Sequence, residues 1–533
     1  MTLLAIEGLT VALPRGADRA NAVEEVSFTL DPGEVLCIVG ESGSGKSVSA
    51  AALTGLLPPG LAVTAGRIGF EGRDLRGASA AAMRALRGAR IGTVFQEPMT
   101  ALNPLMRVGD QVAEVMQVHG RPVGGRVADL LAAVGLPDPG RIARSYPHAL
   151  SGGQRQRVMI ATALALEPAI LIADEPTTAL DVTTQKQILA LIRDIQRRRG
   201  TAVLFITHDF GVVAEIADRV AVMQRGRIVE QGTAAAVLSS PQHPYTKALI
   251  AAVPHRAAAA RVPMEGAPVP VLALDRVSKT YRSRGLFRPG RVVPAVQAAS
   301  LELRRGETLG LVGESGSGKS TLARCIVRLV MADEGAIRFG GTDLRPLSRT
   351  GWMPYRKRIQ MVFQDPYASL NPRRRVGDIL AEGPVAHGVP PARARARATE
   401  LLALVQLDPG AADRFPHEFS GGQRQRIGIA RALAMDPELL IADEPVSALD
   451  VSVQAQVLAL LEELRVRLGL TMLFITHDLR VAAQICDRVA VMRRGVIVEQ
   501  GRTDVVFANP AHDYTRTLLE SVPGRGWTPP SGV

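Results

Sequence analysis

Two glycine-rich loops carry the clearest chemistry in this sequence. Residues 40–47 and 313–320 share one sequence, Gly-Glu-Ser-Gly-Ser-Gly-Lys-Ser. Because glycine has no side chain, the backbone N–H groups of such a loop can surround phosphate oxygens, and the N-terminus of a following helix adds partial positive charge. The lysine can contact the outer phosphates, and the last serine offers an oxygen ligand for Mg²⁺.

We therefore predict that both segments, here called the phosphate loops, bind ATP with Mg²⁺ as cofactor. A glycine-rich turn that only caps a helix is the alternative. Two matches in one chain, each after an apolar run, favour nucleotide binding. The loop residues expected to contact ATP are Gly40, Glu41, Ser42, Gly43, Ser44, Gly45, Lys46, Ser47, Gly313, Glu314, Ser315, Gly316, Ser317, Gly318, Lys319 and Ser320.

An Asp-Glu pair ends an apolar run in each half of the sequence. The pairs are Asp174-Glu175 and Asp443-Glu444. Parallel sheets bind ligands at the carboxyl ends of their strands, so we expect the aspartates to hold Mg²⁺ and the glutamates to orient and deprotonate the attacking water. On its own, such a pair could equally cap a helix. The accompanying phosphate loop favours catalysis.

Histidines and glutamines recur in the same way. His208 and His477 each occur in Ile-Thr-His-Asp, and we expect them to contact the transferred phosphoryl group. Gln96 and Gln364 each follow Val-Phe and are expected to position water or Mg²⁺. A structural histidine and a solvent-facing loop glutamine are the alternatives. The predicted metal ligands are Ser47, Gln96, Asp174, Ser320, Gln364 and Asp443.

An internal duplication supplies the elements that position these residues. Ser-Gly-Gly-Gln-Arg-Gln-Arg occurs at 151–157 and again at 420–426, in the same order relative to the other motifs. Repeats of solenoids span about 20–50 residues, so this repeat is a whole domain. Residues 254–270 are rich in Ala, Pro and Arg and are expected to form a linker. The predicted domains are 1–253 and 271–533.

Apolar runs at 35–39 and 308–312 lead directly into the phosphate loops. They predict buried parallel strands followed by helices. A chain of 533 residues has room for three or four domains of average size, or for two large α/β domains. The duplication favours two.

Composition limits the compartment and the partners. A net charge of +12 fits nucleic acid, an anionic membrane or a solvated arginine-rich surface, and the scattered arginines favour the last. The cysteines Cys37, Cys325 and Cys486 occur singly, which indicates a reducing compartment. We expect no signal peptide, and no stretch has the roughly 20 apolar residues of a membrane span.

Together these residues resemble the ATP-binding cassette (ABC) ATPases over almost all of both halves. The segments 151–157 and 420–426 are similar to the family's signature segment, which in one domain closes over nucleotide held by the other. The resemblance implies two tandem α/β P-loop domains, each with a mostly parallel core sheet, an antiparallel β part and an inserted helical subdomain at about 97–150 or 365–419. It also implies that residues 179–181 and 448–450 lie at the seam between the domains.

The resemblance pairs the motifs of one half with the signature of the other. One site would combine Lys46, Gln96, Asp174, Glu175 and His208 with Ser420, Gly421, Gly422 and Gln423. The other would combine Lys319, Gln364, Asp443, Glu444 and His477 with Ser151, Gly152, Gly153 and Gln154. Both sites are expected to hydrolyse ATP.

Narrower features resemble importers of dipeptides, oligopeptides, glutathione and nickel. They are the segments 96–104 and 364–372, which both end in Leu-Asn-Pro, and His-Pro-Tyr-Thr and His-Asp-Tyr-Thr at 243–246 and 512–515. This implies an ATPase peripheral on the cytoplasmic face of the inner membrane, with two permease subunits and an extracytoplasmic solute-binding protein, and no nucleic acid. The helical subdomains would dock on the permeases. The solute stays open, and a tandem-cassette ATPase acting on ribosomes or DNA is the alternative.

Two departures from the family pattern stand out. Tyr281 matches the aromatic residue that stacks on adenine in the second half, whereas residues 11–13 offer no aromatic in the first. Some relatives also carry a cysteine cluster near the C-terminus that could hold iron and sulfur. No cysteine follows Cys486 here, so no iron-sulfur cluster is expected.

Overall fold

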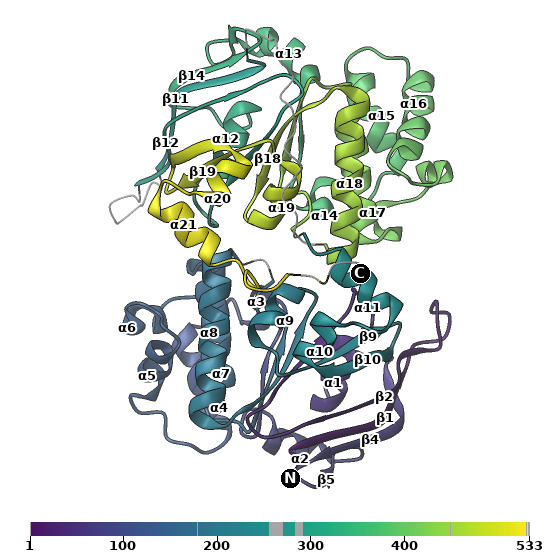
Figure 1. Ribbon diagram of the computed structural model, residues 1–533, viewed down its shortest axis with the longest axis vertical. Coiled ribbons are helices and arrows are strands. Elements are labelled where there is room, and N and C mark those ends of the chain that lie inside the picture. Colours follow the sequence, from purple (N-terminus) through teal and green to yellow (C-terminus); the bar gives the residue numbers. More distant parts are fainter. Residues whose placement is uncertain are drawn as a thin grey trace.

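The computed structural model describes residues 2–178, 180–254, 270–282, 292–447, 449–528 and 530. Two halves of similar architecture are stacked along the long axis of the molecule (Figure 1). Apart from its two end residues, the expected linker lies outside the described residues. So do Ala179 and Ala448 of the expected seam loops.

A six-stranded sheet forms the centre of each half. Its order is β10-β9-β3-β8-β7-β6 in the first half and β20-β19-β13-β18-β17-β16 in the second. Five strands are parallel, and the last in sequence pairs antiparallel at one edge. The strands are β3 (Val35–Val39), β6 (Ile91–Val94), β7 (Ile170–Asp174), β8 (Ala202–Thr207), β9 (Arg219–Gln224), β10 (Arg227–Thr233), β13 (Thr308–Val312), β16 (Ile359–Val362), β17 (Leu439–Asp443), β18 (Thr471–Thr476), β19 (Arg488–Arg493) and β20 (Val496–Arg502).

The strand before each phosphate loop is buried on both faces. In β3, Val35, Cys37 and Val39 belong to one hydrophobic core, while Leu36 and Ile38 belong to the other. Successive side chains of a strand point to opposite faces, so a strand between two cores must be apolar at every position. The predicted strands at 35–39 and 308–312 are confirmed.

A smaller antiparallel sheet packs against one face of each central sheet. Its orders are β2-β1-β4-β5 and β12-β11-β14-β15. The shared core contains residues of both sheets, such as Leu4 and Phe70 of the small sheet and Ile38 of the central one. The strands are β1 (Leu4–Ala12), β2 (Asn21–Leu30), β4 (Ala62–Phe70), β5 (Arg73–Asp74), β11 (Leu272–Arg282), β12 (Val292–Leu303), β14 (Glu334–Phe339) and β15 (Thr342–Asp343).

Helices cover the opposite face of each central sheet. A further helical region lies, in sequence, between β6 and β7 in the first half and between β16 and β17 in the second. That region contains α3 (Pro98–Ala101), α4 (Val108–Val118), α5 (Arg126–Ala133), α6 (Pro139–Ala143) and α7 (Gly152–Ala163) in the first half, and α14 (Pro366–Ser369), α15 (Val376–Ala386), α16 (Pro391–Leu404) and α17 (Gly421–Leu433) in the second. The expected fold class, two α/β domains with parallel and antiparallel sheets and added helices, is confirmed.

The remaining helices connect the sheets and the two halves. They are α1 (Lys46–Thr54), α2 (Ala80–Leu86), α8 (Val182–Arg199), α9 (Phe210–Ile216), α10 (Ala234–Ser239), α11 (Pro244–Ala251), α12 (Lys319–Ile326), α13 (Arg349–Arg358), α18 (Val451–Leu468), α19 (Leu479–Ile485), α20 (Thr503–Ala508) and α21 (Asp513–Glu520). No helix within the described ranges is long and apolar enough to cross a membrane.

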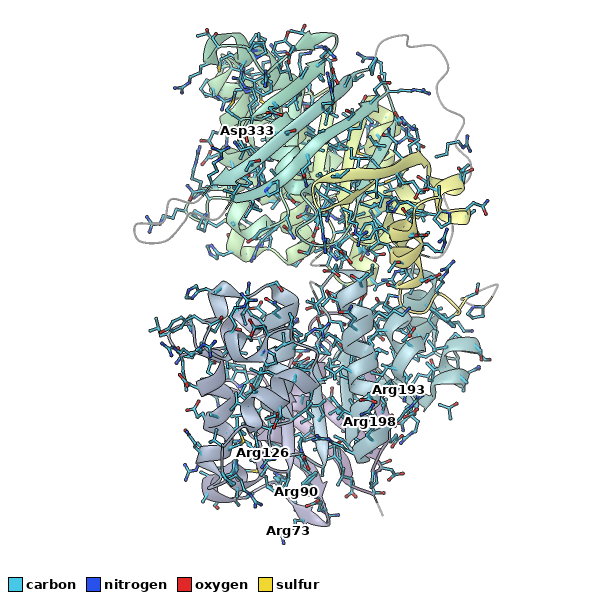
Figure 2. The ribbon with its side chains drawn as sticks, turned by 90° about the vertical axis from the view of Figure 1, so that its left-hand side faces the viewer. Arg73, Arg90, Arg126, Arg193, Arg198 and Asp333 are labelled. Carbon is cyan, nitrogen blue, oxygen red and sulfur yellow. The ribbon has the colours of Figure 1, made fainter. Side chains whose placement is uncertain are left out.

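Charged side chains cover the outside of both halves. Figure 2 shows the labelled arginines of the first half at several places on its surface. Many arginines lie beside carboxylates, as Arg193 beside Asp218 at 3.2 Å and Arg198 beside Asp194 at 2.6 Å. This arrangement agrees with the solvated arginine-rich surface that the sequence favoured.

At the seam, each half contributes an apolar side chain that packs against the hydrophobic core of the other. Val182 of α8 belongs to the core cluster of the second half, and Val451 of α18 packs against that of the first. The C-terminal helix α21 lies beside α8 of the other half (Figure 1). Lys186 Nζ donates to the backbone oxygen of Glu520 at 2.8 Å across this contact.

One cross-seam ion pair has no counterpart in the duplication. The Arg480 guanidinium donates to Asp209 of the first half at 2.8 and 3.0 Å, and also to Asp478 of its own half. The first half has Gly211 in the equivalent place, where an added Cβ would lie 2.7 Å from Arg480 Nη1. Gly211 therefore leaves room for the arginine, and the contact is one-sided.

We expect Arg480→Ala to lower the free energy of unfolding by roughly 3–5 kcal/mol at pH 7, because two mostly buried carboxylates lose their cation. Burial alone would raise the pKa of Asp209, but the charge and hydrogen bonds of Arg480 lower it below its usual value. The stabilisation is thus complete above the unfolded pKa of about 3.9 and disappears as the pH falls through the lower folded value.

Urea denaturation at pH 7 and at pH 5 should show the same loss in free energy of unfolding for the variant relative to the parent. This loss should shrink only at a pH below 5. Arg467→Ala, at an exposed position on α18, is the control and should change stability by no more than about 0.5 kcal/mol. A deficit that disappears between pH 7 and pH 5 would contradict this assignment.

Candidate functional site

The phosphate loops have the backbone geometry that their glycines predict. In the first, Gly45 has φ 103°, and an added Cβ at Gly40 would lie 2.2 Å from the Met223 backbone oxygen. Side chains at these positions would collide with the neighbouring strand. The helix α1 begins at Lys46, so its free N–H groups point toward the loop.

The loop lysines are buried and bonded to the backbone of their own loops. Lys46 Nζ donates to the oxygens of Gly40 and Glu41, both at 2.8 Å, and Lys319 makes the same contacts with Gly313 and Glu314 at 2.7 and 2.9 Å. Burial lowers the pKa of Lys46, against the opposing effects of nearby carboxylates that include Asp450 of the other half. Each lysine ammonium is thus held against the backbone oxygens at the start of its own loop.

A serine and an aspartate lie together beside each lysine. Ser47 Oγ donates to Asp174 Oδ1 at 3.0 Å, and Ser320 Oγ donates to Asp443 Oδ1 at 3.0 Å. A hydroxyl and a carboxylate in contact are hard oxygen donors of the kind that Mg²⁺ prefers. Burial raises the pKa of Asp174 to about 6, although the Ser47 hydrogen bond opposes that rise. An ionised Asp174 is therefore costly in the nucleotide-free protein.

We expect Asp174→Asn to stabilise the nucleotide-free protein by roughly 3 kcal/mol at pH 7.5, since its pKa is raised from 3.8 to about 6 and one pKa unit corresponds to about 1.4 kcal/mol. Because the folded pKa is raised, the ionised carboxylate costs stability above that pKa, and the cost is absent below the unfolded pKa. The gain in stability should therefore disappear near pH 4. Independently of pH, the substitution should abolish ATP turnover at that site. Denaturation without Mg²⁺ and nucleotide checks this, and a variant less stable than the parent at pH 7.5 would refute it.

The glutamate after each aspartate is held in a strained backbone conformation. Glu175 and Glu444 have φ values of 45° and 47°, in the left-handed region that only a few per cent of non-glycine residues adopt. Their backbone N–H groups donate to Ile206 and Ile475 at 2.9 Å, so the neighbouring central strand fixes both positions.

The histidine and glutamine of each half converge on this glutamate. His208 Nδ1 lies 3.4 Å from Glu175 Oε2, and Gln96 Nε2 donates to the same oxygen at 3.1 Å. Thr178 Oγ1 also donates to it at 2.9 Å. Burial would raise the pKa of Glu175, but His208, Thr178 and Lys46 together lower it to about 2. The carboxylate is therefore ionised at neutral pH.

The second half repeats this arrangement. His477 Nδ1 lies 3.2 Å from Glu444 Oε2, and Gln364 Nε2 donates to that oxygen at 2.9 Å. Burial would raise the pKa of Glu444, but the hydrogen bond and charge of His477 lower it. The predicted polar residues of each half thus lie together.

The signature segments form helix N-termini. Ser151 and Ser420 are the N-caps of α7 and α17, and each forms a capping box with Gln154 or Gln423. The capping box satisfies two end groups of the helix and fixes its first turn. Gly153 and Gly422 pack so closely on α8 and α18 that an added Cβ would lie 2.6 Å from Thr184 or 2.3 Å from Val453.

The first signature segment lines a cleft with the second phosphate loop. This cleft, of about 760 Å³, is lined by residues 151–154 together with 314–316. Asp181, the N-cap of α8, lines both this cleft and a neighbouring one that contains Lys319, Gln364 and Glu444. At the other seam, Ser452 of α18 donates to Glu41. The described contacts therefore join each phosphate loop to the opposite half.

The two halves differ at the place expected for adenine. Tyr281 is the penultimate residue of β11 and its side chain is partly exposed, and Lys279 Nζ lies 5.9 Å from its ring centre. In the first half, Arg19 Nη2 donates to the Gly43 oxygen at 2.5 Å, so a guanidinium lies beside that loop. Sequence reasoning missed Arg19, since no repeat or motif marks it.

Sequence reasoning also missed several residues that support the site. Thr178 has a visible signal, because Thr178 and Ser447 occupy the same place after each Asp-Glu-Pro. The others, Thr183, Ser452, Tyr245 and Tyr514, contact the phosphate loops from distant parts of the chain.

The fold and the duplicated site define an ABC ATPase, and the chain belongs to this family of ATP-hydrolysing proteins. The family model described as ABC transporter matches residues 23–178 and 296–447. A second model, described as oligopeptide/dipeptide transporter, C-terminal region, matches residues 229–287 and 498–527.

Relatives of known name match nearly the whole chain. The glutathione import ATP-binding protein GsiA of Shigella boydii is 48% identical, over 98% of this chain and 89% of that protein. The peptidoglycan transport ATP-binding protein YejF of Agrobacterium fabrum is 48% identical, over 97% and 96%. A solved dimeric structure of the ATP-binding cassette MJ0796 with ADP and Pi covers 44% of this chain and 98% of its own, with 29% identity and a TM-score of 0.40.

Proposed function

We propose that this chain is the energy-coupling ATPase of an importer for peptides, of the kind represented by glutathione and peptidoglycan fragments. The observation that carries this proposal is the pair of matches to the oligopeptide/dipeptide C-terminal region, at 229–287 and 498–527. The names of the relatives, which specify import of glutathione and transport of peptidoglycan, support the same solute class.

Two composite ATP sites would drive the cycle. Each would use the phosphate loop, Asp-Glu pair, glutamine and histidine of one half and the signature segment of the other. The cleft shared by residues 151–154 and 314–316 supports this pairing. N–H groups at the start of α7 or α17 would bind the γ-phosphate and bring the halves together. Hydrolysis would then release them.

The residues of each half would divide the chemistry of phosphoryl transfer. Lys46 and Lys319 would neutralise charge on the phosphates, and Glu175 and Glu444 would accept a hydrogen bond from the attacking water. His208 and His477 would orient those carboxylates and contact the γ-phosphate. Mg²⁺, held by Ser47 and Asp174 or by Ser320 and Asp443, would supply charge neutralisation at the phosphate oxygens.

The partners would be two permease subunits and an extracytoplasmic solute-binding protein, with this chain peripheral on the cytoplasmic face of the inner membrane. The helical region after Gln96 supports a docking role, because Met99 is 56% exposed and Leu105 is 87% exposed. Exposed large apolar side chains are the kind of residue found in interaction sites.

Co-purification and uptake test this function. Membranes from cells that express the tagged chain should yield the permease subunits, and loss of the chain should stop uptake of peptides. Leu105→Glu with Met99→Glu should break the association and leave ATP turnover intact. Val466→Glu, at a 68% exposed position on α18, is the matched control. Normal peptide uptake without the chain would overturn the proposal.

A further inference from the structure

The second residue of each phosphate loop is bonded from two directions. The Glu41 backbone N–H donates to Tyr245 Oη at 3.1 Å, and that hydroxyl donates to the Glu41 carboxylate at 3.2 Å. Tyr245 lies in the first turn of α11, in the same half. From the other half, Ser452 donates to the second oxygen of the same carboxylate.

The second loop repeats the backbone hydrogen bond to a tyrosine and the hydroxyl contact from the opposite half. The Glu314 backbone N–H donates to Tyr514 Oη at 3.2 Å, and Tyr514 lies in the first turn of α21. Thr183 of the first half donates to Glu314 Oε1 at 2.5 Å. Thr183 and Ser452 hold equivalent positions, two residues after Asp181 and Asp450.

These contacts lead directly to the phosphate-binding groups. The backbone oxygen of Glu41 accepts a hydrogen bond from Lys46 Nζ, and that of Glu314 accepts one from Lys319 Nζ. One residue therefore connects a tyrosine of its own half, a hydroxyl of the opposite half and the loop lysine. Burial raises the pKa of Tyr245 above its usual value, so this phenol stays protonated and can donate.

We propose that Tyr245–Glu41–Ser452 and Tyr514–Glu314–Thr183 are two clamps through which the opposite half positions each phosphate loop for ATP. The tyrosines and hydroxyls are positioning residues, since they act through the glutamate and not on the nucleotide. The tyrosine fixes the loop to its own half, and the hydroxyl fixes it to the other. This inference rests on the proposed composite sites.

Paired variants in the full-length chain test the clamps. Each pair makes the same change at both ATP sites, so that the two sites stay equivalent. Tyr245→Phe with Tyr514→Phe removes both phenol hydroxyls, and Thr183→Ala with Ser452→Ala removes both cross-seam donors. One hydrogen bond is worth about 0.5–1.5 kcal/mol, so each pair should raise the KM for ATP about 3- to 10-fold. We expect kcat to stay within about twofold, since the groups near the γ-phosphate are untouched.

Two results distinguish a clamp from a general loosening of the contact between the halves. They are non-additive effects of the two variant pairs on KM and a normal KM when both hydroxyls are kept. The quadruple variant should have the KM of either pair, because both act through one glutamate. The exchange variant, Thr183→Ser with Ser452→Thr, keeps a hydroxyl at both positions and should therefore have the parental KM for ATP. Lys186→Ala breaks a cross-seam bond away from the loops and should leave the KM unchanged.

Additive effects on KM, or an equal effect of Lys186→Ala, would overturn the clamps. Gly421→Asp with Gly152→Asp distinguishes this failure from failure of the composite sites. If those signature variants abolish turnover while the clamp variants change nothing, the sites are composite and the clamps are wrong. If the signature variants leave turnover intact, the composite sites themselves are wrong.

Discussion

Replacing Glu175 and Glu444 together by glutamine is expected to reduce ATP turnover by a factor of about 10²–10⁴, the usual contribution of a positioned acid–base group. Glutamine keeps the size of the side chain but removes the negative charge that attracts the attacking water. ATP binding should persist, because each phosphate loop and its lysine are unchanged. The measurements are steady-state phosphate release and the amount of nucleotide bound per chain.

The low pKa of Glu175 sharpens this prediction. A carboxylate with a pKa of about 2 is ionised over the whole physiological range, so acidification to pH 5 should not reduce turnover through this group. Such a carboxylate is a weak base, so we expect its main contribution to be orienting the water, in keeping with a reaction controlled by positioning. A single substitution should leave the other site chemically intact.

A matched substitution tests whether the effect is local. Glu167 also has a positive φ, 54°, and pairs with Arg199 at 3.3 Å on the surface. Glu167→Gln should leave turnover unchanged, since a surface ion pair contributes little. If the double variant at 175 and 444 still hydrolyses ATP rapidly, these residues are not the water-positioning groups.

The second large effect is expected at the signature segments. Gly421→Asp with Gly152→Asp should reduce turnover about 10²- to 10³-fold, because a carboxylate beside the γ-phosphate costs several kcal/mol and each 1.4 kcal/mol is a factor of ten. The fold should tolerate both changes. An added Cβ at Gly421 would lie 3.8 Å from Leu449, and one at Gly152 would have no described atom within 4 Å.

The charge can be separated from the volume. An aspartate in the first turn of a helix interacts favourably with the helix dipole, so thermal stability should not fall. Gly421→Asn with Gly152→Asn introduces the same shape without charge and should retain most of the turnover. Equal losses for Asp and Asn would indicate a steric effect and would contradict a γ-phosphate contact at these positions.

Local pattern predicted the parts of the site that lie at the ends of strands. The run at 35–39 had to be a strand buried on both faces, because all five residues are apolar and a glycine loop follows. The Asp-Glu pair stands at the carboxyl end of its strand as predicted, since β7 extends from Ile170 to Asp174 and its last residue is the aspartate. The duplication supplied the rest, because each motif appears twice in one order.

Contacts between residues far apart in the sequence, within one half or across the seam, could not be predicted in this way. Ser452 lies 411 residues from Glu41, and Tyr245 lies 204 residues from it, so no spacing or period connects them. The contact of Arg480 could not be predicted from the sequence for a different reason. Its partner Asp209 belongs to the other half, and Gly211 occupies the equivalent place there, so comparison of the halves shows only a mismatch.

The central claim is that each ATP lies between the phosphate loop of one half and the signature segment of the other. Counting occluded ATP per chain tests it most directly, in the hydrolysis-blocked Glu175→Gln, Glu444→Gln background with two combinations of site variants. Lys46→Ala with Gly421→Asp alters one composite site and should leave about one ATP per chain, whereas Lys46→Ala with Gly152→Asp alters both and should leave none. The opposite pattern, one ATP with Gly152→Asp and none with Gly421→Asp, would show that each site lies within a single half.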